Sequence, residues 1–492
     1  QAFTAQAQAQ TAQVAAATAS DRVERLPDVV AKEVAAAKPK TDKIYYKGVN
    51  ITLGGFLEAA SIYRDHNLGS DIASSFNNIP YDNVRTGHAD ELRFSARQSR
   101  LSALVQGDVN PHVHLGMYGE FDFQAAAQTA NSNESNSYNP RIRHLYGTVD
   151  WDDFQGEGFG LHLLAGQNWS LATLNTKGIT PRNELTPPQI DAQYVPGFVW
   201  ARQPQVRLTG DFLNHSLWAA VSVENPQTTF YTVGTPAGAN GANGTAAALP
   251  SNLAYNITGA SGFNSANSLS LTHVPDVIAK VAYEMKPMGH TVHVEGFGLF
   301  KAFYDRRNGQ DDNVYGGGGG FGVVAQIIPD KLDLQGSGLF GKGIGRYGSS
   351  QLPDATFRPD GRIEPITEAM FLAGGTFHAT KLLDVYAFAG EEHSDRQAYT
   401  TANGLAYGYG NPLYTDAGCS IEGSTACNGN TKLIEQATLG FWQKVYQGPF
   451  GRVQFGAQYS YTERHGYSGV GSSSGPEQDE NMIFTSFRYY PF

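Results

Sequence analysis

The sequence has few charged residues and no long apolar run. Charged side chains make up 16% of its 492 residues, whereas about 25% is usual for soluble globular domains. No apolar run reaches the roughly 18 residues that a membrane-spanning helix requires. The mean hydropathy of −0.34 is typical of a soluble chain. It also fits a membrane barrel, because barrel strands alternate in polarity and give only a weak hydropathy signal.

Common catalytic motifs are also missing. The sequence contains no HExxH zinc motif, no GxxxxGK[ST] phosphate loop and no CxxC pair. His112 and His114 stand two apart in a predicted strand and could face one metal ion, but a pair lining a wall is the better interpretation, because no further ligand flanks them. We therefore expect no enzymatic activity, no metal and no cofactor. The net charge of −11 argues against a nucleic-acid partner.

Cysteine is scarce as well. The only two cysteines, Cys419 and Cys427, lie in the polar stretch DAGCSIEGSTACNGN. This close spacing predicts a local disulfide formed in an oxidising compartment. Two unpaired thiols are the alternative.

Glycine, aromatic residues and alternating polarity are abundant. The chain has 56 glycines and 12% aromatic residues, a profile that a soluble β-sandwich or propeller partly shares. Apolar and polar residues alternate with period two in 113–123, 276–284 and 452–462. Such segments predict strands with one apolar and one hydrated face.

The predicted links between strands alternate in length. Short links are expected at 108–111, 151–157, 209–214, 285–289, 328–331, 379–381 and 446–450. Long polar links are expected at 62–92, 124–140, 168–197, 225–273, 304–314, 345–365, 393–431 and 464–480. Together they join 16 strands, as an up-and-down outer-membrane barrel requires. We therefore predict an all-β fold, a closed 16-stranded antiparallel transmembrane β-barrel over residues 45–492, with no unpaired strand edge in the hydrocarbon.

The two ends of the chain differ from its middle. Residues 1–44 are rich in Ala, Gln, Val and Lys and predict either a short periplasmic helix or a disordered tail. Because the chain begins at Gln1, we expect a signal peptide to have been removed. The final segment MIFTSFRYYPF resembles the C-terminal signal of outer-membrane barrels. We expect a bacterial outer-membrane protein with a periplasmic N-terminus.

The long link at 168–197 carries a compact polar centre with Lys177, Arg182 and Glu184. By position and length it resembles the third loop of general porins, which folds into the lumen and narrows it. The alternative is a loop that only caps the outside. We favour the infolded constriction loop, because long ordered loops are usually functional.

Arginines cluster in the predicted strands around this link. An arginine that faced lipid at mid-depth would cost about 2–4 kcal/mol, so these side chains should face the lumen or an interface. Guanidinium groups suit carboxylate and phosphate oxygens, and Glu120 and Asp122 would lie opposite them. A mild anion preference follows, although structural pairing with carboxylates in a nearly unselective pore is the alternative. The strand arginines are Arg93, Arg97, Arg100, Arg141, Arg143, Arg202 and Arg207.

Three segments resemble the DcaP-like trimeric outer-membrane transporters: NSYNPRIRHLYGTVD at 136–150, GQNWS at 166–170 and PGFVWARQPQVRLTGDF at 196–212. The resemblance is clearest over residues 45–225. It implies a 16-stranded barrel, a homotrimer, a preceding periplasmic helical segment and uptake of small organic anions such as dicarboxylates. The Ala/Gln-rich start and the long stretch 225–273 depart from the family pattern. The basic constriction that the resemblance implies consists of Arg97, Arg100, Arg143, Arg202 and Arg207, with the infolded loop near Arg182.

Passive diffusion of small polar solutes, with small organic anions preferred, is the leading interpretation. Its alternatives are a non-selective or sugar-preferring general porin, a surface or adhesive barrel, and an enzyme housed in a barrel. The expected partners are small solutes, outer-membrane lipid and two further copies of the chain.

Overall fold

The computed structural model describes residues 43–125, 139–154, 158–232, 249–259 and 264–492. The predicted N-terminal helix or tail at 1–44 therefore lies almost wholly outside the described residues. The chain divides into two units, Gln1–Thr52 and Leu53–Phe492. In the first unit, β1 (Ile44–Tyr46) pairs with the start of β2 (Val49–Arg64) in antiparallel register.

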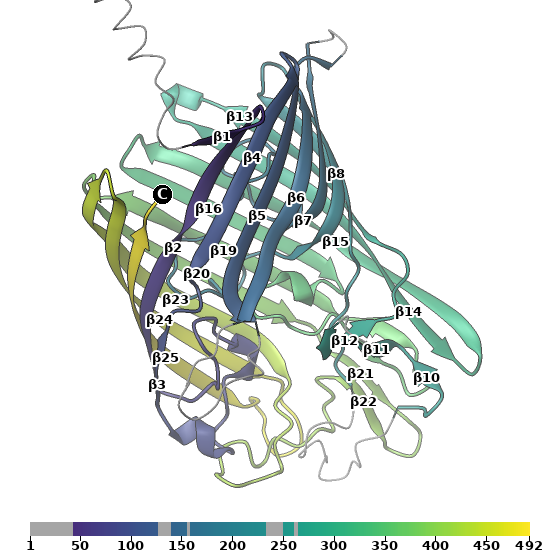
Figure 1. The fold of residues 1–492 in the computed structure, drawn as a ribbon. Helices are drawn as coiled ribbons and strands as arrows, with labels where there is room; N and C mark the ends of the chain where they lie inside the picture. The colour runs from purple at the N-terminus through teal and green to yellow at the C-terminus, as the bar shows by residue number, and fades with distance from the viewer. Residues whose placement is uncertain (1–42, 126–138, 155–157, 233–248, 260–263) are drawn as a thin grey trace, which may run out of the picture. The chain divides into compact units, whose positions relative to one another are not determined.

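The second unit is a closed antiparallel barrel of 16 strands (Figure 1). Leu57–Arg64 of β2 pairs with Met482–Tyr489 of the last strand, which joins the two ends of the sheet. The predicted all-β barrel and its strand number are thereby confirmed. After β2, the strands are the interrupted pair β3 (Glu91–Ser95) and β4 (Arg100–Asn110), then β5 (Val113–Ala125), β6 (Asn139–Trp151), β7 (Gly160–Trp169), β8 (Arg202–Phe212), β9 (Leu217–Glu224), β13 (Asp276–Met285), β14 (Val292–Arg307), β15 (Gln310–Ile328), β16 (Leu332–Lys342), β19 (Thr367–His378), β20 (Leu383–Ser394), β23 (Thr431–Gly448), β24 (Gly451–Gly466) and β25 (Glu477–Tyr490).

Side chains alternate across the barrel wall. In β24, Phe455 and Tyr459 are 41% and 47% exposed on the outer face, whereas Gln458 and Ser460 are buried on the inner face. The period-two pattern of the sequence produces this arrangement, because successive strand residues point to opposite faces of the sheet.

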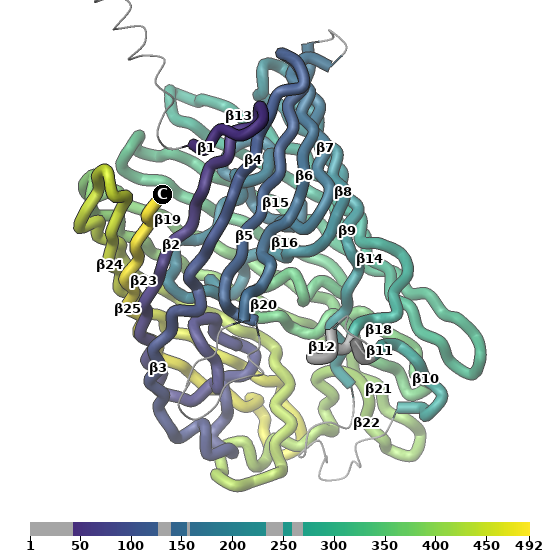
Figure 2. The backbone as a smooth tube through the Cα atoms, viewed as in Figure 1, coloured from purple at the N-terminus to yellow at the C-terminus, as the bar shows by residue number. Residues whose placement is uncertain are grey.

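The seven predicted short links are present and gather at one end of the barrel, which we call the short-link end (Figure 2). The opposite end carries the long links and is called the loop end. Some long links contain small hairpins, namely β11 (Asn256–Gly259) with β12 (Asn264–Ser270), β17 (Ala355–Phe357) with β18 (Ile363–Pro365), and β21 (Gln397–Thr400) with β22 (Ala406–Tyr409).

One predicted long link is wrong. At 304–314 the strands β14 and β15 continue and are joined by Asn308 and Gly309 alone. Both residues have positive φ, 51° and 79°, as a two-residue type I′ hairpin turn requires. The polar composition of this stretch reflects the tips of two long strands rather than a loop.

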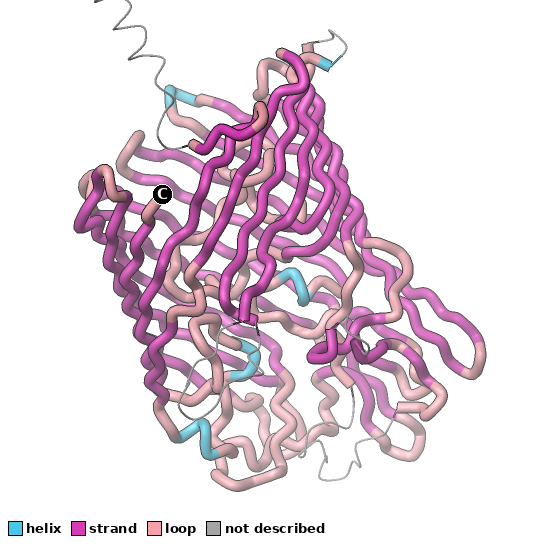
Figure 3. Tube along the Cα trace, viewed as in Figure 1, coloured by secondary structure: helices cyan, strands magenta, loops and turns pink. Residues whose placement is uncertain are grey.

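Within the described residues, helical structure is limited to short 3₁₀ turns, and none of these residues lies in an α-helix (Figure 3). No helix among them is long and apolar enough to cross a membrane. The 3₁₀ turns are η1 (Phe76–Asn78), η2 (Arg85–His88), η4 (Pro287–Gly289) and η5 (Gly345–Tyr347).

An apolar core lies within the barrel. Side chains from three long links, including Ile72, Phe198 and Leu352, pack against inward-facing wall residues such as Tyr386 and Trp442. Burial of this kind contributes about 25 cal/mol per Å² of apolar area removed from water. The long links are therefore fixed to the wall, and they occupy part of the lumen.

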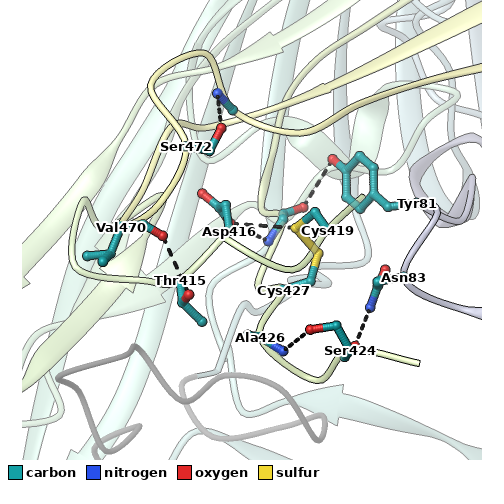
Figure 4. Close-up of a disulfide and its surroundings, with 12 residues drawn as sticks. Tyr81, Asn83, Thr415, Asp416, Cys419, Ser424, Ala426, Cys427, Val470 and Ser472 are labelled. Carbon is teal, nitrogen blue, oxygen red and sulfur yellow. Dashed lines mark hydrogen bonds between the residues drawn. A yellow bond between two sulfur atoms is a disulfide. The ribbon is translucent and has the colours of Figure 1, made fainter. Parts of the chain in front are cut away.

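Cys419 and Cys427 form the predicted disulfide, with their Cα atoms 4.7 Å apart (Figure 4). Asn83 of the β2–β3 link donates a hydrogen bond to the carbonyl oxygen of Ser424 (3.2 Å), inside the disulfide loop. The backbone N–H of Asp416 donates to the carbonyl oxygen of Val470 (3.0 Å). The disulfide loop thus connects to two other long links at the loop end.

Candidate functional site

The β7–β8 link, residues 170–201, crosses the lumen. Its backbone N–H groups donate to the side-chain oxygens of Glu295 on β14 (3.2 Å), Glu392 on β20 (2.9 Å) and Gln458 on β24 (2.6 Å). Trp442 on β23 donates its indole N–H to the carbonyl oxygen of Pro188 (2.9 Å). Because these strands are distant from β7 and β8 in the order of the barrel, the link spans from one wall to another.

A β-bulge in β6 turns several charged side chains toward the lumen. Glu120 pairs with His144 and Phe121 with Ile142, so Arg143 has no partner in the register. A bulge of this kind lets neighbouring residues face the same side of a sheet. Arg143 and His144 are accordingly both buried, at 2% and 4% exposure.

Carboxylates on β5 pair with several of the strand arginines. Arg143 lies 2.5 Å from Glu120 and 3.1 Å from Asp122, and Arg141 lies 2.7 Å from Asp122. Arg100 is 4.0 Å from Glu120. Arg100, Glu120 and Arg143 border a cavity of about 280 Å³, here called the Glu120 cavity. Its charged lining residues are Arg100, Glu120, Arg143, Arg182 and Glu184.

A second cavity, of about 460 Å³, is lined by Arg141, Arg202 and Arg346 together with Trp200 and Gln351. We call it the basic cavity. No acidic side chain lines it in the described part of the chain. Three guanidinium groups thus share one space. Among the described residues, Arg141 alone of the three pairs with a carboxylate, that of Asp122, which lies outside the lining of the cavity.

Two of these arginines keep N–H donors free in the described structure. Arg202 stacks on Trp169 and Trp200, with ring-centroid distances of 5.2 and 5.3 Å, and its buried Nε has no hydrogen-bond partner. Arg346 donates to Gln203 (2.6 Å) through one terminal nitrogen, while the other is buried without a partner. Guanidinium N–H groups donate hydrogen bonds to the oxygens of carboxylates and phosphates.

Tyr194, on the link that crosses the lumen, reports the positive potential. Burial alone would raise the pKa of its phenol, but the guanidinium groups of Arg143, Arg100 and Arg202 outweigh that effect and lower the pKa below its ordinary value. A region that favours a phenolate would also favour a dissolved anion.

Other residues singled out from the sequence lie elsewhere. Arg97 donates to the carbonyl oxygen of Ala125 (2.6 Å), and Arg207 donates to that of Trp169 (2.6 Å), so both hold backbone in place. Arg93 pairs with Glu91 (3.0 Å) in β3, and Lys177 is exposed on the link.

Sequence reasoning missed Arg346, Trp169 and Trp200. Arg346 falls in a stretch that was predicted to be an external loop, yet the adjoining Tyr347 is completely buried. An aromatic residue flanked by Gly345 and Gly348 was the one available signal that this link packs inward, because small neighbours permit close backbone approach.

Comparisons with known proteins support the fold. No protein-family model and no curated protein sequence matches the chain. The structure is similar to that of the outer membrane channel DcaP of Acinetobacter baumannii, at 18% identity and a TM-score of 0.60 over 91% of this chain and 99% of that one. An anion-selective porin from Comamonas acidovorans matches at 10% identity and a TM-score of 0.46 over 90% and 99%, too weakly to support a conclusion. The resemblance to DcaP-like porins is thereby confirmed at the level of the fold.

Proposed function

We propose that the chain is a bacterial outer-membrane porin through which small polar solutes diffuse passively, with small organic anions such as dicarboxylates preferred. The basic cavity is the observation that carries this proposal, because the side chains of Arg141, Arg202 and Arg346 line it and no carboxylate does among the described residues. Two adjacent guanidinium groups would favour a dianion over a monoanion.

The outer wall supports membrane insertion. Large apolar side chains such as Leu208, Phe321, Phe340 and Leu439 are exposed on it, and hydrocarbon would cover them at no cost in hydrophobic free energy. We further propose a homotrimer, on the basis of the sequence resemblance, and a constriction formed by the β7–β8 link. Selectivity would then arise from the lumen charge at that link.

Reversal potentials in planar lipid bilayers test the proposal. With the purified protein between unequal KCl solutions, chloride should permeate more readily than potassium. In tenfold-lower salt the preference should grow, because screening weakens as the Debye length increases. A cation-selective channel would contradict the anion preference.

A solute panel separates the alternatives. Liposome swelling should be faster with a dicarboxylate than with a neutral sugar of similar size. Equal rates would favour a non-selective porin, and faster sugar entry a sugar-preferring one. A protein that inserts but never conducts would instead support a surface or adhesive barrel.

A further inference from the structure

Four histidines at the short-link end share one arrangement. Each lies on a strand with its ring on the inner side of the barrel, and each ring nitrogen lies within hydrogen-bond distance of a different carboxylate. His114 on β5 lies between Asp108 (2.6 Å) and Asp152 (2.9 Å). His162 on β7 lies between Asp150 (2.8 Å) and Asp211 (3.0 Å).

The arrangement recurs on the other side of the barrel. His293 on β14 lies between Glu284 (2.6 Å) and Glu295 (3.1 Å). His378 on β19 lies between Asp384 (2.7 Å) and Asp333 (3.2 Å). We call the four groups the histidine bridges. Three of them connect carboxylates from the strands or turns on both sides of the histidine.

The chemistry of imidazole makes these bridges sensitive to protons. A neutral ring has one N–H donor and one lone pair, whereas the protonated ring has two donors. An ionised carboxylate only accepts hydrogen bonds. Both contacts of each bridge can therefore be hydrogen bonds only when the histidine carries its positive charge. When the proton leaves, a nitrogen lone pair faces a carboxylate oxygen at about 3 Å. The two negative charges of the carboxylates are then no longer partly offset by the histidine.

Other charged groups surround the bridges. Lys280 lies 2.6 Å from Glu295, Lys444 lies 3.1 Å from Asp384, and His215 lies 3.1 Å from Asp211. Lys177 acts electrostatically on Glu284. A cavity of about 460 Å³ borders the His378 bridge and is also lined by Asp330, Lys331 and Lys381. Of these side-chain types, only imidazole ordinarily titrates near neutral pH, so we expect the histidines to be the members whose charge changes there.

Water reaches at least two of the bridges. The side chains of His114 and His378 are 34% and 33% exposed, whereas His293 is buried. A charge that changes at these positions therefore acts on the aqueous space of the lumen and not only on protein packing.

We propose that the histidine bridges form a proton-controlled charge filter at the short-link end of the lumen. Each bridge has two carboxylates and one imidazole, so protonation of the ring offsets one of the two negative charges and weakens the repulsion of anions. Deprotonation leaves both negative charges, which opposes anions and favours cations. The filter is a second selectivity element, separate from the basic cavity. It rests on the proposed porin function only in that the protein must conduct ions; it does not require that anions are preferred.

The test is the ratio of chloride to potassium permeability at pH 6 and pH 8.5, measured from reversal potentials in low salt. Ordinary exposed aspartate and glutamate titrate near pH 4 and lysine near pH 10.4. Burial raises the pKa of Asp416, in the β20–β23 link at the loop end, to about 6, so histidine variants are needed to assign a pH response to the bridges. A unit charge about 8 Å away in water changes an ion's energy by about 0.5 kcal/mol. We therefore expect the ratio to be roughly twofold or more higher at pH 6. A wild-type ratio that does not change with pH would overturn the proposal.

Variants assign the effect to the bridges. His114→Asn combined with His378→Asn should remove most of the pH dependence. His88→Asn is the matched control, because His88 lies in the β2–β3 link at the loop end, and its pH dependence should match that of wild type. An undiminished pH response in the double variant would refute the filter.

Two further outcomes keep the proposal separate from the proposed function and from folding defects. A channel that prefers cations at both pH values, yet loses its pH response in the double variant, would refute the anion preference and retain the filter. Should the double variant fail to insert, ¹⁵N NMR of the wild-type histidine side chains decides. Doubly protonated rings at pH 6 that become neutral by pH 8.5 support the filter, and rings that are neutral at pH 6 overturn it.

Discussion

The two walls of the lumen use charge for different purposes. On the side of β4–β8, arginines line two cavities, and Arg346 from the β16–β19 link joins Arg141 and Arg202 in the basic cavity. On the side of β14–β20, buried carboxylates accept backbone N–H groups from the long links. The same feature, a charged residue in a barrel strand, thus offers a binding surface on one side and anchors the links on the other.

Glu392 illustrates the anchoring side. One of its carboxylate oxygens accepts the N–H groups of Gly197 and Ser350, each at 2.9 Å. These residues belong to two different links, so one side chain fixes both. Glu368 on β19 similarly accepts the N–H of Ile344 at 2.8 Å.

The largest effect is expected from Glu392→Ala. The substitution leaves two buried N–H groups without a partner, at a cost of about 1–3 kcal/mol each. Glu392→Gln is the matched control, because its amide oxygen can still accept both bonds. We expect the alanine variant to melt at a clearly lower temperature in detergent and to show unsteady single-channel current. A normal melting temperature with a steady current would contradict the anchoring role.

The next largest effect is expected at the basic cavity. Arg202→Gln combined with Arg346→Gln should lower the permeation of a dicarboxylate by at least about fivefold, because each of the two unit charges removed contributes about 1 kcal/mol at 4 Å in water. Passage of a neutral sugar should change little. Arg306→Gln combined with Arg358→Gln, at two exposed arginines outside the basic cavity, is the matched loss of two charges. If sugar and dicarboxylate lost permeation equally, the arginines would act by shape and not by charge.

The smallest effect is expected from Arg93→Gln. Arg93 pairs with Glu91 at 3.0 Å, but its side chain is 41% exposed, and exposed ion pairs contribute about 0–1 kcal/mol. Both the melting temperature and the reversal potential should remain close to those of wild type. A large shift in the reversal potential would show that anions pass along β3. The proposed anion site at the basic cavity would then be wrong.

Much of the fold was predictable because its signals are local. Strand polarity follows from period two, and the turn at Asn308 and Gly309 carries a recognisable Asn-Gly sequence even though the predicted long link overlooked it. The disulfide followed from two cysteines eight residues apart. The bulge at Arg143 was not predictable, because it depends on how β5 and β6 pair and not on the residues of β6 alone.

The candidate site was only partly accessible from the sequence. Arg141 and Arg202 were singled out from the sequence as strand arginines, and they line one cavity, since β6, β7 and β8 are neighbours in both sequence and space. Arg346 comes from a link more than a hundred residues further along the chain, and no local pattern connects it to them. Nothing in the local sequence indicates whether a strand carboxylate such as Glu392 faces water or anchors a link.

By itself, the order of polar and apolar residues determined an antiparallel barrel and the number of its strands, because each strand's two faces and each link's length are properties of nearby residues. The tertiary structure alone decided which links enter the lumen, which arginines keep free donors and which carboxylates are consumed as anchors. These outcomes depend on contacts between segments distant in the chain, where packing and hydrogen bonding select one arrangement among many that the same local pattern permits.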